Sequence, residues 1–583
     1  MLRPMANLFA VADPDSAFLD RIEKRLRDAA EFDQIWRPAP GWVVAQAPLP
    51  ESGPDSEELR SRGFVFAEGR DRLERDRPAG WEDRLAELTD RAPERLSELP
   101  GDFSFLRFRS DGSMLAVRSC AGLVPFYVEH RPRRIVFGTL QSHFPRFLPR
   151  PYDADPLMTP IWEHALHFID DRTFLEGVSA LPPASYTLLA LERPRRTGTY
   201  WDPRPPAGAS IEPDPERPEV LRTLLVEALD RDLDPDGRNL AMLSGGVDSS
   251  SVVALAAGVV GRGLSTWSMI PAHEPGRSHE LSFINPLVRE LGVEPARITE
   301  LTFSTRERWA REAPGLPFRV VNPGLCELPR ICAEQEVRVL VGGEFADEVG
   351  GHWARIGDWC RHTSLRELIT RDTPLPFGRR DYLVWTKRRL LDLLRRPPLH
   401  SRDSLPAWVL PEVEEEYRDW LRRERGALVR DKRPLKELAE HVAGGVWVAM
   451  NWEATSALGV RRSLPFFNRE VLELAFSCHP HELLGPGPKV LLRRALRGDV
   501  PQRNLERKDK ASRLEDRPGR CQTSTSVALD NGIPSTAHRL ARPDWLPDSP
   551  PDALHVDILR LRSTLRVAKY LEDQAKEAGQ RHP

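Results

Sequence analysis

Two patterns of hydrophobic and polar positions divide this chain. Between Leu99 and Phe144, apolar and polar residues alternate in short runs that are separated by Gly, Asp, Pro and Arg. Alternation with a period of two is typical of half-buried strands, and the turn residues between them predict an antiparallel sheet. The expected strands are Asp102–Phe108, Met114–Arg118, Phe126–Val128 and Arg134–Thr139.

The pattern changes in the C-terminal part. Apolar runs alternate there with longer helical stretches, and this alternation predicts a parallel sheet. Ligands of such sheets gather at the carboxyl ends of the strands, so the residues that directly follow the strands are the first candidates for a site. The expected strands are Leu240–Leu243, Leu264–Ile270, Arg297–Phe303 and Val337–Val341, and the expected helices cover Val252–Val260 and about Glu280–Leu291.

Length and composition limit the possible organisation and partners. A chain of 583 residues predicts more than one domain, and the Pro-rich stretch Pro203–Pro218 is the best linker candidate. We therefore expect one domain over residues 1–205 and a second over residues 215–583. The formal charge of −3 argues against nucleic acid or a membrane surface as the main partner, and no apolar run is long enough to span a bilayer. Six cysteines without a CxxC pair, together with the absence of a signal pattern, predict a cytoplasmic protein.

The stretch that follows the first expected parallel strand has the composition of a phosphate-binding loop. Backbone N–H groups and a helix N-terminus converge on an anion in such a loop, and paired glycines let the main chain approach it closely. Serine hydroxyls can donate to phosphate oxygens, and Asp248 can hold a divalent cation. The loop lacks the Gly-Lys-Ser/Thr of a Walker A loop. The expected nucleotide-binding residues are Leu243, Ser244, Gly245, Gly246, Val247, Asp248 and Ser249, with Ser268 and Gly343 from the neighbouring strands.

A second loop with flanking glycines follows the expected strand Val337–Val341. Its sequence is Gly342-Gly343-Glu344-Phe345-Ala346-Asp347-Glu348. At the same edge of the sheet, Asp347 can join Asp248 on Mg²⁺, and the cation can neutralise pyrophosphate as it leaves. The second loop therefore predicts an enzyme rather than a nucleotide-binding module.

Both loops resemble known families. Residues Ser244–Ser249 match the SGGxDS loop of the ATP-pyrophosphatase superfamily, which implies attack at the α-phosphate of ATP, AMP transfer and pyrophosphate release. The second loop resembles the Ser-Gly-Glu-Gly-Ser-Asp-Glu segment of asparagine synthetases. This resemblance implies that Glu344 is the catalytic glutamate and that Asp347 binds the metal. Phe345 departs from the small residue of that segment.

Further C-terminal segments resemble the same synthetase domain. Residues Arg461–Val471 and Lys489–Leu496 look like its helical part, with Asn468 in place of the usual aspartate. The segment Arg507-Lys508-Asp509-Lys510 resembles the place of the family's catalytic lysine, in a chain that has only nine lysines. An ammonium there would stabilise the α-phosphate and the oxyanion of the tetrahedral intermediate. Lys510 is the first choice, Lys508 is the second, and a solvated basic loop is the alternative.

The N-terminal strands resemble the class II glutamine amidotransferase domain of asparagine synthetases. In that domain, the nucleophile is the cysteine exposed by removal of the initiator Met. This chain has Leu2 instead, and its first cysteine, Cys120, lies in an apolar turn. We expect Cys120 to be a core residue and the domain to be a scaffold without amidotransferase activity. The segments that carry the resemblance are Leu99–Phe105, Arg118–Tyr127, Val136–Thr139, Gly177–Tyr186 and Tyr200–Trp201.

The resemblances together imply an α/β protein in which an Ntn-type α+β sandwich domain precedes an ATP-pyrophosphatase-type parallel-sheet synthetase domain with a helical C-terminal part. Without a glutaminase, the amine must belong to a substrate, as in lasso peptide cyclases and in β-lactam and carbapenam synthetases. The charged region Phe377–Gly444, with an amphipathic pattern from Val384 to Arg396, favours a peptide substrate, and a covering surface helix is the alternative interpretation. Most of the tryptophans in and near this region are expected in the core. They are Trp353, Trp359, Trp408, Trp420, Trp447 and Trp452.

The predicted function is a lasso peptide macrocyclase that uses ATP and Mg²⁺. It would join the side-chain carboxylate of an Asp or Glu in a precursor peptide to the N-terminal amine of that peptide. The resemblance implies a leader peptidase and a leader-binding protein of the same pathway as further partners. The alternatives are a β-lactam, carbapenam or asparagine synthetase-like amide ligase, and a non-catalytic scaffold that senses nucleotides.

Overall fold

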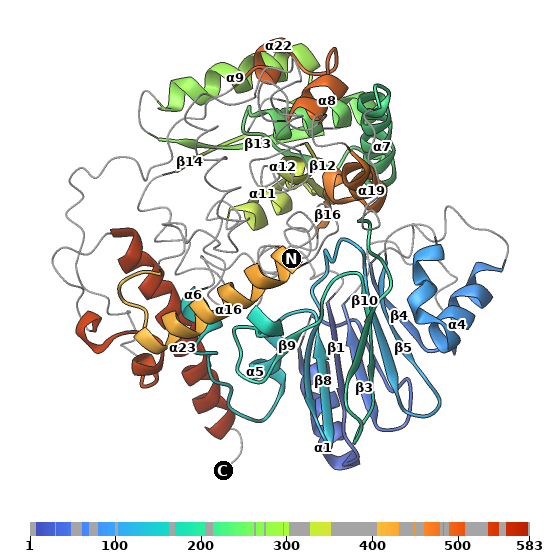
Figure 1. The fold of residues 1–583 in the computed structure, drawn as a ribbon, viewed down its shortest axis with the longest axis vertical. Coiled ribbons are helices and arrows are strands. Elements are labelled where there is room, and N and C mark those ends of the chain that lie inside the picture. Colours follow the sequence, from blue (N-terminus) through green and yellow to red (C-terminus); the bar gives the residue numbers. More distant parts are fainter. Residues whose placement is uncertain are drawn as a thin grey trace.

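The computed structural model of the chain shows two antiparallel sheets beside a parallel sheet with helices on both faces (Figure 1). It describes residues 7–29, 31–47, 61–68, 80–99, 103–161, 169–204, 214–261, 264–272, 276–294, 297–301, 327–350, 405–430, 448, 452, 460–478, 482, 489–507, 534–546 and 555–580.

The first antiparallel sheet has six strands among the described residues. Their order is β2-β3-β1-β8-β7-β9, so the first strand of the chain lies inside the sheet and pairs with both β3 and β8. The bounds are β1 Leu8–Ala12, β2 Gln34–Trp36, β3 Trp42–Gln46, β7 Tyr127–Arg131, β8 Arg134–Gly138 and β9 Ser179–Ala180.

The second antiparallel sheet has five strands in the order β11-β10-β6-β5-β4. Its bounds are β4 Phe64–Glu68, β5 Ser104–Phe108, β6 Met114–Arg118, β10 Ser185–Leu189 and β11 Arg196–Thr199. The predicted period of two is visible in both sheets, because alternate residues of a strand enter different hydrophobic clusters. In β6, Met114 and Ala116 face a core shared with the first sheet, whereas Leu115 and Val117 face the opposite side.

Helices cover the outer faces of this sandwich. α1 (Ser16–Asp28) and α5 (His143–Phe147) pack on the six-stranded sheet, and α4 (Trp81–Arg91) packs on the five-stranded sheet. The N-terminal part is therefore a helix, sheet, sheet, helix arrangement, and the Ntn type expected from the resemblance remains a prediction. Cys120 is buried in the cluster on the α4 side, as expected for a core thiol, with its Sγ 3.7 Å from Tyr200 Oη.

The C-terminal part contains the predicted parallel sheet. Its five strands lie in the order β14-β13-β12-β15-β16, and every neighbouring pair is parallel. The chain forms β12, β13 and β14 toward one edge and then β15 and β16 toward the other, so the order reverses between β12 and β15. The bounds are β12 Asn239–Met242, β13 Leu264–Pro271, β14 Arg297–Leu301, β15 Val339–Val341 and β16 Arg461–Ser463.

Helices pack on both faces of the parallel sheet. α7 (Arg217–Asp232), α8 (Val247–Val260) and α9 (Gly276–Leu291) share one hydrophobic cluster, and α11 (Leu328–Glu334) belongs to the cluster on the other face. α8 buries Val252, Val253 and Leu255, because nearly all of its positions are Ala, Val or Ser and it has no polar stripe. The remaining elements near the sheet are α12 (Ala346–Gly350), η8 (Pro465–Phe467), α19 (Arg469–Ser477), α21 (Val490–Ala495) and α22 (Gln502–Leu505).

One expectation about this part is wrong. Residues Arg461–Val471 resembled a helical segment, but Arg461–Ser463 form the edge strand β16, and only the residues from Pro465 onward are helical. Two adjacent arginines do not show the pattern of a strand. Pairing with β15, rather than local propensity, makes this segment extended.

The two parts of the chain are packed against each other. Trp201 Nε1 donates to Glu473 at 2.8 Å, and the guanidinium of Arg469 on α19 donates to the carbonyls of Leu99 and Ser97 at 2.9 and 2.8 Å. The expected linker lies mostly outside the described residues, so the domain boundaries at 205 and 215 remain a prediction.

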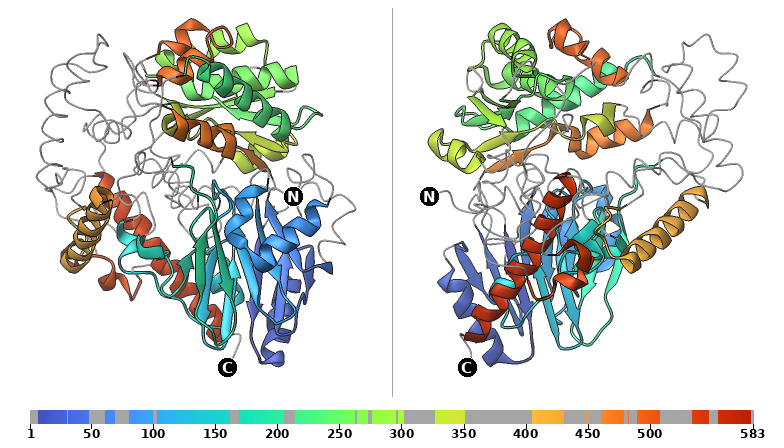
Figure 2. Two further views of the ribbon diagram at one scale, coloured as in Figure 1. Left: turned by 45° about the vertical axis from the view of Figure 1, so that its right-hand side comes forward. Right: turned by 90° about the vertical axis from the view of Figure 1, so that its left-hand side faces the viewer.

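The C-terminal helices return to the N-terminal sandwich. α23 (His555–Gln580) packs on α5 and α6 (Met158–Ile161), on the outer side of the six-stranded sheet (Figure 2). α16 (Pro411–Arg430) contributes residues to the same hydrophobic cluster. Trp408 and Trp420 are buried in this cluster, as predicted, whereas Trp452 is only partly buried. The amphipathic stretch Val384–Arg396 and Trp353, Trp359 and Trp447 lie outside the described residues.

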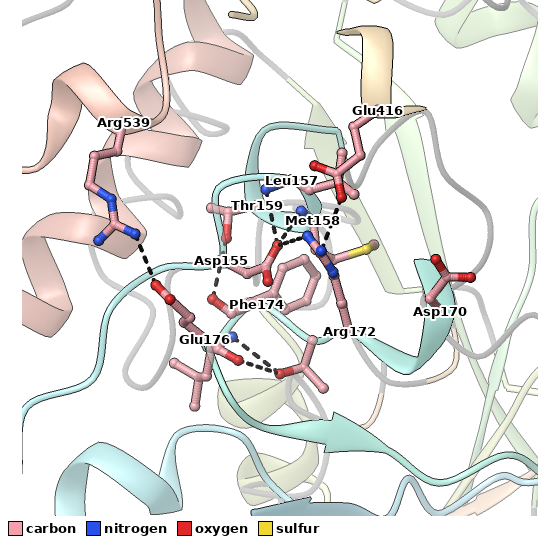
Figure 3. A network of polar contacts seen from close by, with 12 residues as sticks. Asp155, Leu157, Met158, Thr159, Asp170, Arg172, Phe174, Glu176, Glu416 and Arg539 are labelled. Atoms are coloured by element: carbon pink, nitrogen blue, oxygen red, sulfur yellow. Dashed lines mark hydrogen bonds and ion pairs between the residues drawn. The ribbon is translucent and has the colours of Figure 1, made fainter. Parts of the chain in front are cut away.

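A network of polar contacts fastens these C-terminal elements to the sandwich (Figure 3). Arg172 donates to Glu416 of α16 at 3.0 Å, and Arg539 donates to Glu176 at 2.9 Å. Asp155 accepts the backbone N–H groups of Leu157 and Met158 at 3.0 and 2.8 Å. The network joins residues more than 200 positions apart, so α16 is held on the N-terminal part by charge pairs as well as by apolar packing.

Among the described helices, none is long and apolar enough to cross a membrane.

Candidate functional site

The loop between β12 and α8 is the first part of the site. β12 ends at Met242, and α8 begins at Val247. Gly245 has a φ of +68°, and a Cβ there would lie 2.9 Å from the Cβ of Phe283 on α9. Both observations exclude an ordinary side chain, so glycine is what lets the loop fold against α9.

Hydrogen bonds between serines fix the shape of this loop. Ser249 Oγ accepts the backbone N–H of Ser244 at 3.0 Å and lies 3.0 Å from Ser244 Oγ. Leu243 and Val247 have buried side chains, so only their main chain can face a ligand. Because α8 begins directly at the loop, its N-terminus favours an anion there.

Ser268 lies on the neighbouring strand β13. The parallel register pairs Met242 with Trp267, so Ser268 is level with the first residue of the phosphate loop. Its side chain is buried, and its hydroxyl has no hydrogen-bond partner among the described residues. A buried hydroxyl without a protein partner is uncommon, and a ligand atom could supply the missing bond.

The loop after β15 approaches the phosphate loop closely. A Cβ on Gly343 would lie 2.9 Å from the backbone carbon and oxygen of Asp248 and 3.0 Å from the backbone nitrogen of Ser249. The backbones of the two loops are therefore in van der Waals contact, and this is possible only because Gly343 has no side chain. They meet at the carboxyl ends of β12 and β15, where the strand order reverses, which is the usual place for a ligand in an open α/β sheet.

Three charged side chains meet where the loops touch. Lys489 Nζ lies 2.7 Å from Asp347 Oδ1 and also donates to Asp248 Oδ1. Burial, the largest single influence, lowers the pKa of Lys489, but the charges of Asp248 and Asp347 and their hydrogen bonds together raise that pKa above its ordinary value. Lys489 therefore stays protonated, and its ammonium binds both carboxylates at once.

The predicted catalytic glutamate has a fixed orientation. Arg462 on β16 donates to Glu344 Oε1 at 2.6 Å, and both side chains are largely buried. The other oxygen, Glu344 Oε2, is buried and has no hydrogen-bond partner among the described residues. Arg462 therefore orients Glu344 and leaves one of its carboxylate oxygens available to accept a hydrogen bond.

The residues that depart from the family pattern have defined structural roles. Phe345 adopts a φ of +67°, and its ring stacks on Phe467 with the centroids 3.8 Å apart. Asn468 Oδ1 accepts the backbone N–H of Glu470 at 3.0 Å and caps α19, a role that asparagine and aspartate fill equally well.

The segment before the predicted catalytic lysines is anchored to the phosphate loop. Arg507 donates to the carbonyl of Ser244 at 3.1 Å and forms a buried ion pair of 2.8 Å with Glu280 on α9. Asn504 donates to the carbonyl of Gly245 at 3.1 Å. Lys508 and Lys510 lie outside the described residues, so their place relative to the two loops remains a prediction.

The C-terminal part matches a known protein family. The family model described as asparagine synthase matches residues 220–515, which include both loops, Lys489 and Arg507. The chain belongs to the asparagine synthase family. Membership of this family supports the use of ATP to form a carbon–nitrogen bond.

Two curated relatives are similar to part of this chain. The chain is 27% identical over 296 residues to Amidase chry2 of Gibberella zeae, which covers 47% of this chain and 42% of that protein. It is 25% identical over 272 residues to Amidase chyE of Penicillium rubens, which covers 43% of this chain and 40% of that protein. The chain thus spans less than half of the length of each of these relatives.

Two solved structures match a little over a third of this chain at low identity. One is an NH3-dependent NAD synthetase from Campylobacter jejuni, with 13% identity, a TM-score of 0.18, and coverage of 37% of this chain and 95% of that chain. The other is a U34-tRNA thiolase from Methanococcus maripaludis, with 15% identity, a TM-score of 0.17, and coverage of 36% and 80%. The family membership rests on the sequence match and not on these structures.

The acidic residues of the site fit a divalent cation. Asp248 and Asp347 both contact the same cationic nitrogen, so their oxygens already surround one position that a positive charge occupies. Carboxylates are the ligands that Mg²⁺ prefers, and Mg²⁺ usually binds one or two of them together with waters and substrate phosphates. No group of three or more His, Cys, Asp or Glu that could hold a metal occurs in the described ranges. The two aspartates therefore suit a cation that arrives with phosphate oxygens.

Sequence reasoning missed three residues of this site in the asparagine synthase region. No role was predicted for Lys489, Arg462 or Arg507, although all three lie in the segments that resemble the synthetase domain. The scarcity of lysine in the chain was a signal for Lys489, as it was for the pair at 508 and 510. For the two arginines there was no such signal, since arginine is abundant and only the fold shows which ones are buried.

Proposed function

We propose that the protein is an ATP-dependent carbon–nitrogen ligase of the AMP-forming type and that it closes a lasso peptide through an isopeptide bond. The observation that carries the proposal is the meeting of Asp248, Asp347 and Lys489 at the contact between the phosphate loop and the acidic loop. A loop that only bound nucleotide would not need a second acidic loop within contact distance.

The chemistry proceeds in two steps. First, a side-chain carboxylate oxygen of the precursor peptide attacks the α-phosphorus of ATP, the bond between the α-phosphorus and the bridging oxygen breaks, and pyrophosphate leaves. Next, the N-terminal amine of the peptide attacks the acyl carbon, loses a proton, and AMP departs. When bound, Mg²⁺ would neutralise the charge of the pyrophosphate, held by Asp248 and Asp347.

The residues of the chain have separate tasks in this scheme. The loop over residues 243–249 binds the phosphates through its main chain and serine hydroxyls. Glu344, oriented by Arg462, accepts a hydrogen bond from the attacking amine and can receive its proton. Lys510, with Lys508 as the alternative, stabilises the oxyanion of the tetrahedral intermediate. Holding both ends of the peptide in a near-attack pose contributes about 7–11 kcal/mol to lowering the barrier, by analogy with intramolecular reactions.

The source of the amine follows from the N-terminal part. Its two stacked antiparallel sheets with outer helices support the resemblance to a class II glutamine amidotransferase domain. The cysteines in the described part of the chain, Cys120, Cys332 and Cys478, are all buried, so none is an exposed nucleophile for glutamine. Burial raises the pKa of Cys332 to about 12, which keeps that thiol protonated. The amine is therefore proposed to belong to the substrate itself.

The choice of a peptide rests on the long charged region Phe377–Gly444 and on α16, which lies within it and is fastened to the N-terminal part. The two relatives are named amidases, which supports amide chemistry and is compatible with both the formation and the hydrolysis of an amide. A β-lactam, carbapenam or asparagine synthetase-like ligase is the second candidate, because the described site would serve a small substrate equally well. A precursor peptide, a leader peptidase and a leader-binding protein are the proposed partners, and the cytoplasm is the proposed location.

Mass spectrometry of candidate precursor peptides incubated with the protein, ATP and Mg²⁺ tests the proposal. The expected product is lighter than the peptide by one water, and fragmentation shows a link between the N-terminal amine and an Asp or Glu side chain. Asp347→Ala should abolish the product, whereas Asp236→Ala, in the exposed turn at the amino end of β12, should not. Dehydrated product with the Asp347→Ala variant, or an ATP-dependent product in which ammonia has formed a primary amide with the carboxylate, would refute the macrocyclase.

A further inference from the structure

Lys489 occupies an unusual position in the site. It directly precedes α21, where it adopts the left-handed conformation with φ of 64° and ψ of 39°. Only 13% of its side chain is exposed, and the ammonium contacts both carboxylates that the proposed function assigns to the metal. A lysine in this conformation is uncommon and is stable only where its surroundings hold it.

The surroundings that hold Lys489 belong to the acidic loop itself. A Cβ on Gly350 of α12 would lie 3.6 Å from Cβ and Cγ of Lys489 and 3.3 Å from Cβ of Leu492. The stem of Lys489 therefore lies directly against the helix that begins beside Asp347. This packing directs the ammonium toward the two aspartates and limits its freedom to turn elsewhere.

The charges at this position are already balanced by the protein. Asp248 and Asp347 carry two negative charges, and Lys489 supplies one positive charge in direct contact. Arg493, one turn further along α21, is half-buried and interacts electrostatically with Asp248, while its guanidinium donates to the carbonyl of Arg507 at 3.2 Å. A divalent cation added to this set would lie beside two protein cations.

The Lys489 ammonium and a metal ion would compete for the same carboxylate oxygens. Mg²⁺ binds carboxylate oxygens at about 2.0–2.1 Å. The ammonium already contacts Oδ1 of both aspartates, at 2.7 Å from that of Asp347. One position between these two Oδ1 atoms cannot hold both cations, so Lys489 must withdraw before a metal can bind both of these oxygens.

We propose that Lys489 is an internal counter-ion that occupies the cation position between Asp248 and Asp347 and gives it up only when nucleotide phosphates bring further negative charge. The inference rests on the proposed function, which assigns these two aspartates to Mg²⁺. It makes Lys489 a positioning residue that keeps the phosphate loop and the acidic loop together before ATP binds. It also makes the binding of metal and nucleotide cooperative, because each removes an obstacle to the other.

Metal binding by the full-length protein without nucleotide or peptide tests the inference, with Mn²⁺ followed by electron paramagnetic resonance as the probe. The wild type should bind Mn²⁺ weakly. Lys489→Met should bind it about 10-fold more tightly, within the range typical of coupled sites. Lys489→Arg keeps the charge and should bind as weakly as the wild type.

A matched control comes from α23. Lys569 has 15% of its side chain exposed and also faces two carboxylates, Glu572 at 3.9 Å and Asp573 at 3.2 Å. Lys569→Met makes the same chemical change away from the site and should leave Mn²⁺ affinity at the wild-type value. If Lys489→Met does not fold, as judged by circular dichroism, Lys489→Gln is the second variant, with the same expected gain.

Two results would overturn the inference. Equal Mn²⁺ affinity of the wild type and of the folded Lys489→Met or Lys489→Gln variant would mean that the lysine does not exclude the metal. A gain that persists when Asp347→Asn is added to the variant would place the metal at other residues. Because the experiment contains no peptide, loss of the macrocyclase proposal would not change either result.

Discussion

Replacement of Gly343 by alanine tests the contact between the two loops. Gly343 does not have a positive φ, so the backbone accepts alanine there, and the obstacle is space alone. The new Cβ would lie 2.9 Å from the backbone carbon and oxygen of Asp248 and 3.0 Å from the nitrogen of Ser249. These neighbours are backbone atoms and cannot rotate away as a flexible side chain would.

The size of the effect follows from this geometry. Restoring ordinary contact, at about 3.4–3.5 Å, requires the loops to move apart by about 0.5 Å. A misplacement of about 1 Å can cost a factor of about 10² in rate, so half of that distance should cost about 10-fold. Overpacking of this kind also destabilises a protein by about 1–3 kcal/mol. Gly343→Ala should therefore lower kcat for AMP formation by about 10-fold while the protein remains folded.

A matched control is available in α8. Gly258 is exposed, and a Cβ on it would meet nothing within 4 Å. Gly258→Ala should leave AMP formation unchanged and stabilise the protein by about 0.5–1 kcal/mol, because alanine favours a helix interior more than glycine does. The assays are AMP release at saturating ATP and denaturant unfolding. Wild-type turnover of Gly343→Ala would show that the two loops need not touch for catalysis.

Two further substitutions test the segment that ends at the predicted lysines. Lys510→Ala should lower ring formation by about 10²–10³ with little change in ATP affinity, since the oxyanion exists only after the amine attacks. If Lys508→Ala shows this pattern instead, the register of the resemblance is wrong by two residues. Glu280→Gln removes the carboxylate from the buried pair with Arg507 and should cost about 3–5 kcal/mol in the free energy of unfolding. Glu290→Gln on the exposed side of α9 is its control, and equal stability of the two variants would contradict a structural role for the pair.

Elements whose structure depends on a local residue pattern could be predicted from the sequence. Met114–Arg118 was predicted as a strand and is β6 with the same bounds, because alternating side chains enter two different cores. The turn glycines of the phosphate loop were likewise evident, since Gly245 needs a positive φ that few other residues adopt. Such features depend on a few neighbouring residues and can be inferred from them.

The contacts that complete the site could not be inferred in this way. Lys489 meets Asp248 across 241 positions, and Arg462 meets Glu344 across 118 positions. No periodicity relates such residues, and only the parallel sheet and the packing of α21 on α12 bring them together. The strand β16 has the same origin, because Arg461 and Arg462 become extended by pairing with β15.

The proposed reaction is the attack of a peptide carboxylate on the α-phosphorus of ATP at one site that the two loops form together. Its most direct test uses a precursor peptide whose Asp and Glu side chains carry ¹⁸O, with the products analysed by mass spectrometry and ³¹P NMR. We predict that AMP acquires one ¹⁸O atom, that pyrophosphate remains unlabelled, and that the peptide loses one of the two labelled carboxylate oxygens as the ring closes. Formation of ADP, with the label in inorganic phosphate, would contradict it.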